Sequence, residues 1–249
     1  KNKEYQLGGV NFTYNGELHL LSGYDSPLSL TPMSIPANLV SGLVNASYAF
    51  LEHKQGVLDA LSPFQLMSKF WVSSVLGTVL TRMDVPHGTA GYAGQFVFPG
   101  SWYGQQLSIL RRNSMLSLIA PVLIDLDPVA CSVAEALGNA DPYGFGSTRY
   151  ETTAKIHNLD IFSPEFKALS ISSDAVYVWN GLEHFDKDLV RQFINERPGS
   201  IFCVQGTDME HRDGDHQDSC LVCSTEELYE KFIPEDRSVL FEGTLSCFV

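Results

Sequence analysis

Two short apolar runs separated by one amphipathic segment constrain the fold of this chain more than any other feature. Residues 174–181, DAVYVWNG, and residues 200–206, SIFCVQG, each have the length and apolar content of a buried strand. Residues 185–199 between them have the pattern of an amphipathic helix that is broken at Pro198. A strand, a helix and a second strand in this order are typical of α/β folds.

The preceding part of the chain predicts a different mixture of elements. Residues 10–23 alternate around Asn15-Gly16, a dipeptide that favours a type I′ turn, and they predict a β-hairpin. Helices are expected over residues 37–61, 63–80, 101–120 and 127–138, and a short strand is expected over 95–98. Apolar residues cover much of the circumference of the helix at 63–80, so we expect it at the centre of the core.

These patterns predict an α+β protein with an N-terminal hairpin and helices, followed by an α/β-like C-terminal segment. Glycine, asparagine and proline concentrate around residues 138–147, which is the best candidate for an internal boundary. We therefore expect a hairpin plus helical core domain over residues 1–137 and an α/β-like part over residues 148–249. The alternative is that both parts form one continuous domain.

The composition excludes several classes of function. The chain has 249 residues, with 16 Lys and Arg against 29 Asp and Glu, and a formal net charge of −13. Nucleic-acid binding needs a basic surface, so we expect no direct contact with nucleic acid. No apolar run is long enough for a transmembrane helix, so no membrane insertion is expected. The five cysteines are an odd number in a long chain, which favours a reducing, cytoplasmic location over a disulfide framework.

The stretch HRDGDHQDSCLVC, residues 211–223, is the strongest candidate for a metal site. Cys220 and Cys223 have the spacing of a zinc knuckle, and His211 and His216 lie upstream of them. Zinc prefers four nitrogen or sulfur ligands in a tetrahedron, and these four side chains are of that kind. Two alternatives stay open, namely a polar surface loop with passive thiols and a redox-active CxxC motif. We expect no cofactor other than zinc.

No constellation of residues specifies a catalytic site. Glu183 and His184 follow a predicted strand, where α/β proteins often place catalytic groups, but a lone Glu-His pair is a weak signal and surface or capping roles are favoured. The acidic residues within 208–218 lack the spacing of an EF-hand calcium loop. The stretch GTAGYAGQ, residues 88–95, lacks the Lys-Ser/Thr ending of a P-loop and precedes a strand, so we attribute its glycines to backbone freedom.

Two motifs within residues 61–120 carry a family resemblance. They are LSPFQLMSKFW and HGTAGYAGQFVFPGSWYGQQLSILRRNSMLSLIA, in which a helix, a glycine-rich turn, a short strand ending in Pro99 and a Leu-patterned helix follow one another. This order resembles the middle of the IcmJ/DotN family of type IVB secretion and IncI-type conjugation proteins. The cysteines of that family would fall near positions 14–17 and 65–70, where this chain has none, so the family's zinc site does not transfer.

The resemblance implies a non-catalytic adaptor with a degenerate HNH-like fold, which binds partner proteins in a coupling complex at the inner face of a membrane-bound machine. We therefore expect a structural or adaptor component of a larger assembly, and whether the chain is an enzyme stays open. One alternative is a zinc- or thiol-dependent hydrolase that uses His211, His216, Cys220 and Cys223 with Glu183 or His184. A second alternative is a viral or phage structural protein.

Overall fold

A computed structural model describes the chain over residues 3–7, 10–14, 17–22, 33–34, 37–60, 63–82, 94–111, 116, 119–140, 154–205, 233–234, 236–237, 239–241 and 245–248. The strands are β1 (Lys3–Leu7), β2 (Val10–Tyr14), β3 (Glu17–Ser22), β4 (Met33–Ser34), β5 (Gln95–Pro99), β6 (Ala120–Asp125), β7 (Lys155–Asn158), β8 (Val176–Asn180), β9 (Ile201–Gln205), β10 (Val239–Phe241) and β11 (Leu245–Phe248). The helices are α1 (Ala37–Ala49), α2 (Lys54–Asp59), α3 (Pro63–Arg82), α4 (Gln105–Leu110), α5 (Pro128–Ala140), α6 (Pro164–Lys167) and α7 (Lys187–Asn195), with 3-10 turns η1 (Leu51–His53) and η4 (Leu182–His184).

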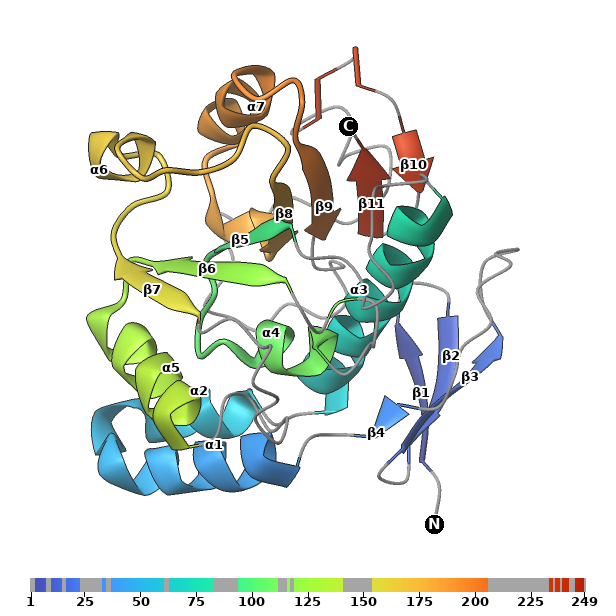
Figure 1. Ribbon diagram of the computed structural model, residues 1–249. Helices are drawn as coiled ribbons and strands as arrows, with labels where there is room; N and C mark the ends of the chain where they lie inside the picture. The colour runs from blue at the N-terminus through green and yellow to red at the C-terminus, as the bar shows by residue number, and fades with distance from the viewer. Residues whose placement is uncertain are drawn as a thin grey trace.

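A seven-stranded sheet in the order β10-β11-β9-β8-β5-β6-β7 forms the centre of the molecule (Figure 1). Its five strands β5 to β9 are parallel, whereas β11 pairs antiparallel with β9 and β10 antiparallel with β11. Parallel neighbours need crossover connections, and the helices α4, α5, α6 and α7 each lie between two successive parallel strands in the chain.

Strands β5, β6, β8 and β9 are buried on both faces, since alternate residues of each strand point to opposite sides and both sets pack in the core. Phe96 and Phe98 of β5 pack with helices α1 to α5 on one face, while Val97 packs with α6 and α7 on the other. In the same way, Val178 and Trp179 of β8 belong to opposite faces. The near-continuous apolar sequence of these strands therefore follows from their position between two helical layers.

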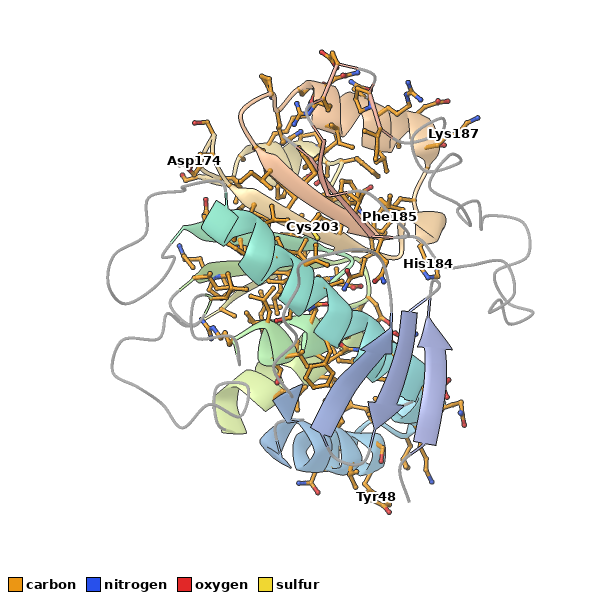
Figure 2. The ribbon with its side chains drawn as sticks, turned by 90° about the vertical axis from the view of Figure 1, so that its right-hand side faces the viewer. Tyr48, Asp174, His184, Phe185, Lys187 and Cys203 are labelled. Carbon is orange, nitrogen blue, oxygen red and sulfur yellow. The ribbon has the colours of Figure 1, made fainter. Side chains whose placement is uncertain are left out.

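A second, smaller sheet in the order β1-β2-β3-β4 is antiparallel and lies next to α3 in both views (Figures 1 and 2). Strands β2 and β3 pair in antiparallel register on the two sides of Asn15-Gly16. The dipeptide itself lies outside the described residues, so its type I′ turn stays a prediction.

Most of the predicted elements after residue 60 are present. The helix expected at 63–80 is α3, and the expected strands at 95–98, 174–181 and 200–206 are β5, β8 and β9. Phe70, Val75 and Leu76 of α3 have no exposed surface, which confirms its central place in the core.

Two predictions of extent were wrong. The single helix expected over 37–61 is divided into α1 and α2 by the turn η1. The helix expected over 101–120 is limited to α4 within the described residues, and Ala120 already begins strand β6. The predicted class was also too narrow, because the parallel arrangement is not confined to the C-terminal third but includes β5 and β6.

The central sheet takes strands from both parts of the expected division, namely β5 and β6 before residue 137 and β7 to β11 after residue 148. Most of the expected boundary, residues 141–147, lies outside the described residues, so the division stays a prediction. Among the helices that the structure describes, none combines the length and the hydropathy needed to cross a membrane.

Candidate functional site

The carboxyl ends of the parallel strands form one edge of the central sheet, and the site is built there. From β5 the chain passes through β6 to β7 on one side, and then returns to β8 and β9 on the other side of β5. The direction of winding therefore changes between β5 and β8. In open parallel sheets, ligands bind outside the carboxyl ends of the strands at such a switch point.

The loop between β5 and α4 has an unusual backbone conformation. Gly100, Trp102 and Gly104 have positive φ angles of 61°, 51° and 78°. This conformation is ordinary for glycine but unfavourable for tryptophan, so other contacts must hold Trp102 in place. Its N–H donates to Oδ2 of Asp125 at 2.8 Å, and its ring stacks on Tyr103 with 4.7 Å between the centroids.

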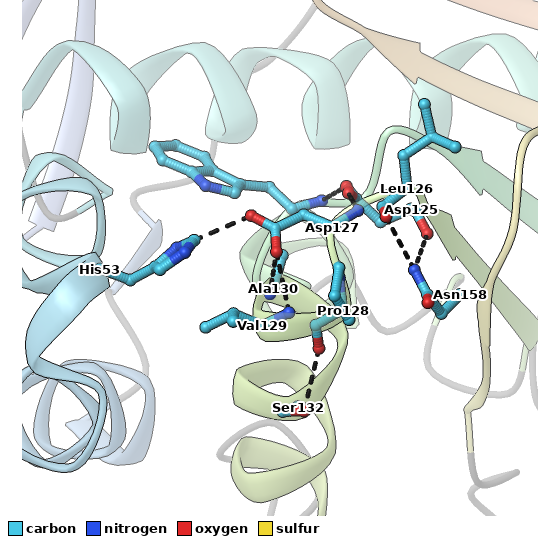
Figure 3. A network of polar contacts seen from close by, with 10 residues as sticks. His53, Asp125, Leu126, Asp127, Pro128, Val129, Ala130, Ser132 and Asn158 are labelled. Carbon is cyan, nitrogen blue, oxygen red and sulfur yellow. Dashed lines mark hydrogen bonds and ion pairs between the residues drawn. The ribbon is translucent and has the colours of Figure 1, made fainter.

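Asp125 ends strand β6, and its carboxylate links this loop to the next one (Figure 3). Oδ2 accepts from the N–H of Trp102, and Oδ1 accepts from the N–H of Asp127 at 2.9 Å. Burial, together with the charge of Asp127, raises the pKa of Asp125 above its ordinary value, although the two backbone donors and the charge of His184 oppose this shift. An ionised carboxylate has about four lone-pair directions, so Asp125 can accept further hydrogen bonds from a ligand.

Asp127 directly precedes helix α5 and lies close to η1, the turn between α1 and α2. Its Oδ1 accepts from the N–H groups of Val129 and Ala130, which is the usual role of an N-cap aspartate. Its Oδ2 lies 3.7 Å from Nδ1 of His53, which is part of η1 (Figure 3). The turn between α1 and α2 is thereby attached to the carboxyl edge of the sheet.

Asn158 at the end of β7 fixes the backbone around Asp125. Its Nδ2 donates to the carbonyl oxygens of Asp125 at 3.1 Å and Leu126 at 2.9 Å. Leu126 is 68% exposed, although it is a large apolar residue at the edge of a buried sheet. An acidic group and an exposed apolar side chain are therefore adjacent at the end of β6.

The segment after β8 forms the other side of the switch point. Gly181 has a φ of 71° and is followed by η4, where His184 is exposed (Figure 2). A Cβ atom at Gly100 would lie only 2.9 Å from the Phe185 ring, so the loops after β5 and β8 are in close contact. Nδ2 of Asn180 donates to Oε1 of Gln106 at 2.8 Å, which joins the end of β8 to helix α4.

The candidate zinc ligands predicted from the sequence are not placed by these observations. His211, His216, Cys220 and Cys223 lie outside the described residues, as does the acidic stretch 208–218. Among the residues that are described, no group of His, Cys, Asp and Glu is arranged to hold a metal ion. The zinc site and its redox and polar-loop alternatives therefore stay predictions, as do the expected protein partners.

Sequence reasoning missed the residues that form the carboxyl-edge site, except for the neighbourhood of His184. A signal was present, because Gly100 and Gly104 lie close together shortly after the predicted strand at 95–98. A glycine-containing turn between a strand and a helix is typical of ligand sites in parallel sheets. Extending the helix over the whole of 101–120 concealed both this turn and the strand that ends at Asp125.

No protein-family model matches the chain, and no curated protein matches it. Solved structures do match. The small RNA methyltransferase HEN1 is 11% identical with a TM-score of 0.51 over 73% of this chain, but only 25% of HEN1 is covered. The SAH-bound methyltransferase PaMTH1 of Podospora anserina is 12% identical over 86% of this chain and 88% of that one, with a TM-score of 0.49. The plantazolicin methyltransferase BpumL in complex with SAH is 10% identical over 78% and 73%, with a TM-score of 0.45.

The likeness to HEN1 shows that the two chains share an α/β fold, and it corrects the predicted identity. The resemblance to the IcmJ/DotN family was wrong, because β5, the strand on which it rested, is a central strand of a parallel α/β sheet and not part of a degenerate HNH-like fold. The expected non-catalytic adaptor of type IV secretion or conjugation rested on this resemblance, so that prediction was wrong as well. The zinc- or thiol-dependent hydrolase and the viral or phage structural protein were alternatives within the same functional prediction, and the α/β fold shared with HEN1 supports neither of them.

Proposed function

We propose that this chain is an enzyme that binds S-adenosylmethionine at the carboxyl edge of its central sheet and transfers the methyl group to an acceptor. The observation that carries the proposal is the placement of Asp125 beside the glycine-containing loop, at the switch point of a parallel sheet. The fold shared with a methyltransferase supports the same conclusion.

Asp125 has the chemistry needed to hold the ribose of an adenosyl group. A ribose offers two neighbouring hydroxyl donors, and a carboxylate with free lone pairs can accept both. Hydrogen bonds to an ionised acceptor are roughly twice as strong as neutral ones. Because two backbone N–H groups already fix the orientation of the carboxylate, its remaining lone pairs have defined directions.

The neighbouring groups fit the rest of such a ligand. Leu126 offers an exposed apolar side chain next to the carboxylate, on which the flat face of an adenine can pack. Gly100 is exposed at the start of the loop, and its positive φ is one that glycine adopts without strain. The exposed His184 on the opposite side can accept a proton in its neutral form.

When bound, the donor supplies a methyl carbon attached to a positively charged sulfur, which an acceptor with a lone pair can attack while the sulfur keeps the bonding electrons. The residues of this chain would bind and orient the donor. The contact between His53 and Asp127 would bring the N-terminal helices over the edge and help to exclude water.

The test is calorimetric titration with S-adenosylhomocysteine, the product form of the donor. We expect the wild-type chain to bind it, and Asp125→Ala to weaken binding at least tenfold, because a charged hydrogen bond contributes about 1.5–3 kcal/mol. Asp125→Asn should also weaken it, since the amide has only one acceptor atom for the two backbone donors.

The matched control is Asp174→Asn, which changes a carboxylate that precedes β8 at the opposite edge of the sheet. This variant should bind like the wild type. If the wild-type chain does not bind S-adenosylhomocysteine, or if the Asp125 variants bind as well as it does, the proposed function is wrong.

A further inference from the structure

Two cysteines that are far apart in the sequence meet across neighbouring strands of the central sheet. Cys203 lies in β9 and Cys247 lies in β11. The two strands pair antiparallel, and Cys247 is the direct register partner of Cys203. The Cα atoms of such a pair are about 4.5 or 5.5 Å apart, depending on the hydrogen-bonding pattern. Both values lie within the roughly 4.4–6.8 Å that a disulfide spans.

The register also places both positions on the same face of the sheet, because direct partners in neighbouring strands share a face. Cys203 belongs to the core cluster that includes Phe70 and Val75 of α3, whereas Phe202 and Val204 belong to the cluster on the opposite face. Figure 2 shows Cys203 near α3, and this helix contacts β11 as well. A disulfide cannot form between Cβ atoms that point apart, and the shared face meets this condition.

The position of Cys131 excludes it as a partner for Cys203. Its Sγ atom lies 3.7 Å from the carbonyl oxygen of Asp125 in β6 and 3.9 Å from that of His157 in β7. Strands β5 and β8 separate these two strands from β9. The cysteines at 220 and 223 lie outside the described residues, so within the described helices and strands only Cys247 can pair with Cys203.

We propose that Cys203 and Cys247 are a redox-active pair that closes to a cross-strand disulfide when a low-molecular-weight disulfide, such as oxidised glutathione, is present. One cysteine thiolate attacks the glutathione disulfide, which forms a mixed disulfide and releases one glutathione thiolate. The second cysteine thiolate then attacks the protein sulfur of the mixed disulfide and releases the other glutathione. The two protein thiols lose two hydrogen atoms, and oxidised glutathione gains them.

Burial determines when this exchange takes place. Cys203 is a thiol with no exposed surface in this structure, so exchange requires the chain to be folding or the outer strands to open. Strand β10 is an edge of the sheet and β11 lies next to it, so these two strands can separate from β9 without opening the parallel part. Once formed, the disulfide would fasten β11 to β9. This inference does not depend on methyl transfer, so either proposal can fail without the other.

The experiment equilibrates the whole chain with reduced and oxidised glutathione, once under native conditions and once in urea. The remaining thiols are alkylated with iodoacetamide after unfolding, and peptides are identified by mass spectrometry before and after reduction. We expect Cys203 to be linked to Cys247 in the native sample, with Cys131 alkylated. The folded register should raise the equilibrium constant for closure at least about a hundredfold over the unfolded chain, which corresponds to about 60 mV.

The matched control is Cys247→Ser/Phe248→Cys, which moves the thiol by one position to the register partner of Phe202, on the other face of the sheet. Its link to Cys203 should form no more readily in the native sample than in urea. If the control does not fold, Cys247→Ser replaces it, and Cys203 should then be recovered alkylated.

Three results would overturn the proposal. The first is a native wild-type sample in which Cys203 and Cys247 are alkylated, joined to glutathione or linked to other cysteines. The second is equal closure of the wild-type pair in the native and urea samples. The third is a folded control that closes as readily as the wild type.

Discussion

Substitution of Gly100 by alanine tests the contact on which the geometry of the site depends. Gly100 has a φ of 61°, and the left-handed region costs a residue with a Cβ atom roughly 1–2 kcal/mol. The new Cβ would also lie 2.9 Å from Cζ of Phe185, well inside ordinary carbon contact of about 3.5–4.0 Å. The ring cannot easily move away, because it packs against Trp179 with 5.1 Å between the centroids.

Overpacking of this kind costs about 1–3 kcal/mol, so Gly100→Ala should lower the free energy of unfolding by about 2–5 kcal/mol in total. The assay is urea denaturation followed by tryptophan fluorescence, which yields the free energy from the midpoint and slope. Such a loss is a large fraction of the roughly 5–15 kcal/mol by which most domains are stable.

The matched control is the double variant Gly100→Ala/Phe185→Leu, in which the smaller side chain relieves the overlap. We expect it to be more stable than the sum of the two single effects predicts, by about 1–2 kcal/mol. A free energy for Gly100→Ala within about 0.5 kcal/mol of the wild type would refute the reasoning, since that is the size of an ordinary surface effect. Strict additivity would instead leave the φ angle as the sole cause.

Three further outcomes are expected. Gly56→Ala should destabilise the wild type, because the new Cβ atom would lie 2.8 Å from the hydroxyl oxygen of Tyr103. In the Tyr103→Phe variant, the same substitution should instead stabilise the protein by up to about 1 kcal/mol through helix propensity. Thermal denaturation of the four proteins measures both effects. Burial raises the pKa of Asp125, so affinity for S-adenosylhomocysteine should fall on acidification at a pH above the roughly 3.9 of an ordinary aspartate, which calorimetry across the acidic range would detect. Burial also raises the pKa of Cys131 to about 11, so mass spectrometry should find its peptide unmodified by iodoacetamide at neutral pH until the protein is unfolded; rapid labelling of the folded protein would contradict this burial.

The sequence predicted elements whose pattern is strong within a short window. Strands β8 and β9 and helix α7 were recognisable because apolar runs of strand length alternate with an amphipathic segment. Helix α3 was recognisable from its length, its apolar surface and the proline at its first position. Each of these signals is local, and each is clear in the sequence because both faces of β8 and β9 and much of α3 are buried.

Strands β6 and β7 were missed for physical reasons that the sequence alone does not reveal. A proline is unusual inside a buried strand, but pairing of β6 with β7 begins only at Val122. On the side that faces β7, Pro121 therefore has no neighbouring strand that would need its missing N–H. The short strand β7 lies at the edge of the sheet and is only partly buried, so it lacks an apolar pattern. Without these two strands, the parallel sheet and its switch point could not be inferred.

The sequence by itself determined that this chain has an α/β-like C-terminal third, a core-forming helix at 63–80, and a formal net charge of −13. Only the tertiary structure decided which polar groups meet at the carboxyl edge of the sheet. Trp102 and Asp125 are 23 positions apart in the chain, and Gln106 and Asn180 are 74 positions apart, yet each pair is joined by a hydrogen bond of 2.8 Å. Their polar atoms meet because parallel strands bring their carboxyl ends to one edge, an arrangement that depends on strand order and therefore on contacts no local pattern encodes.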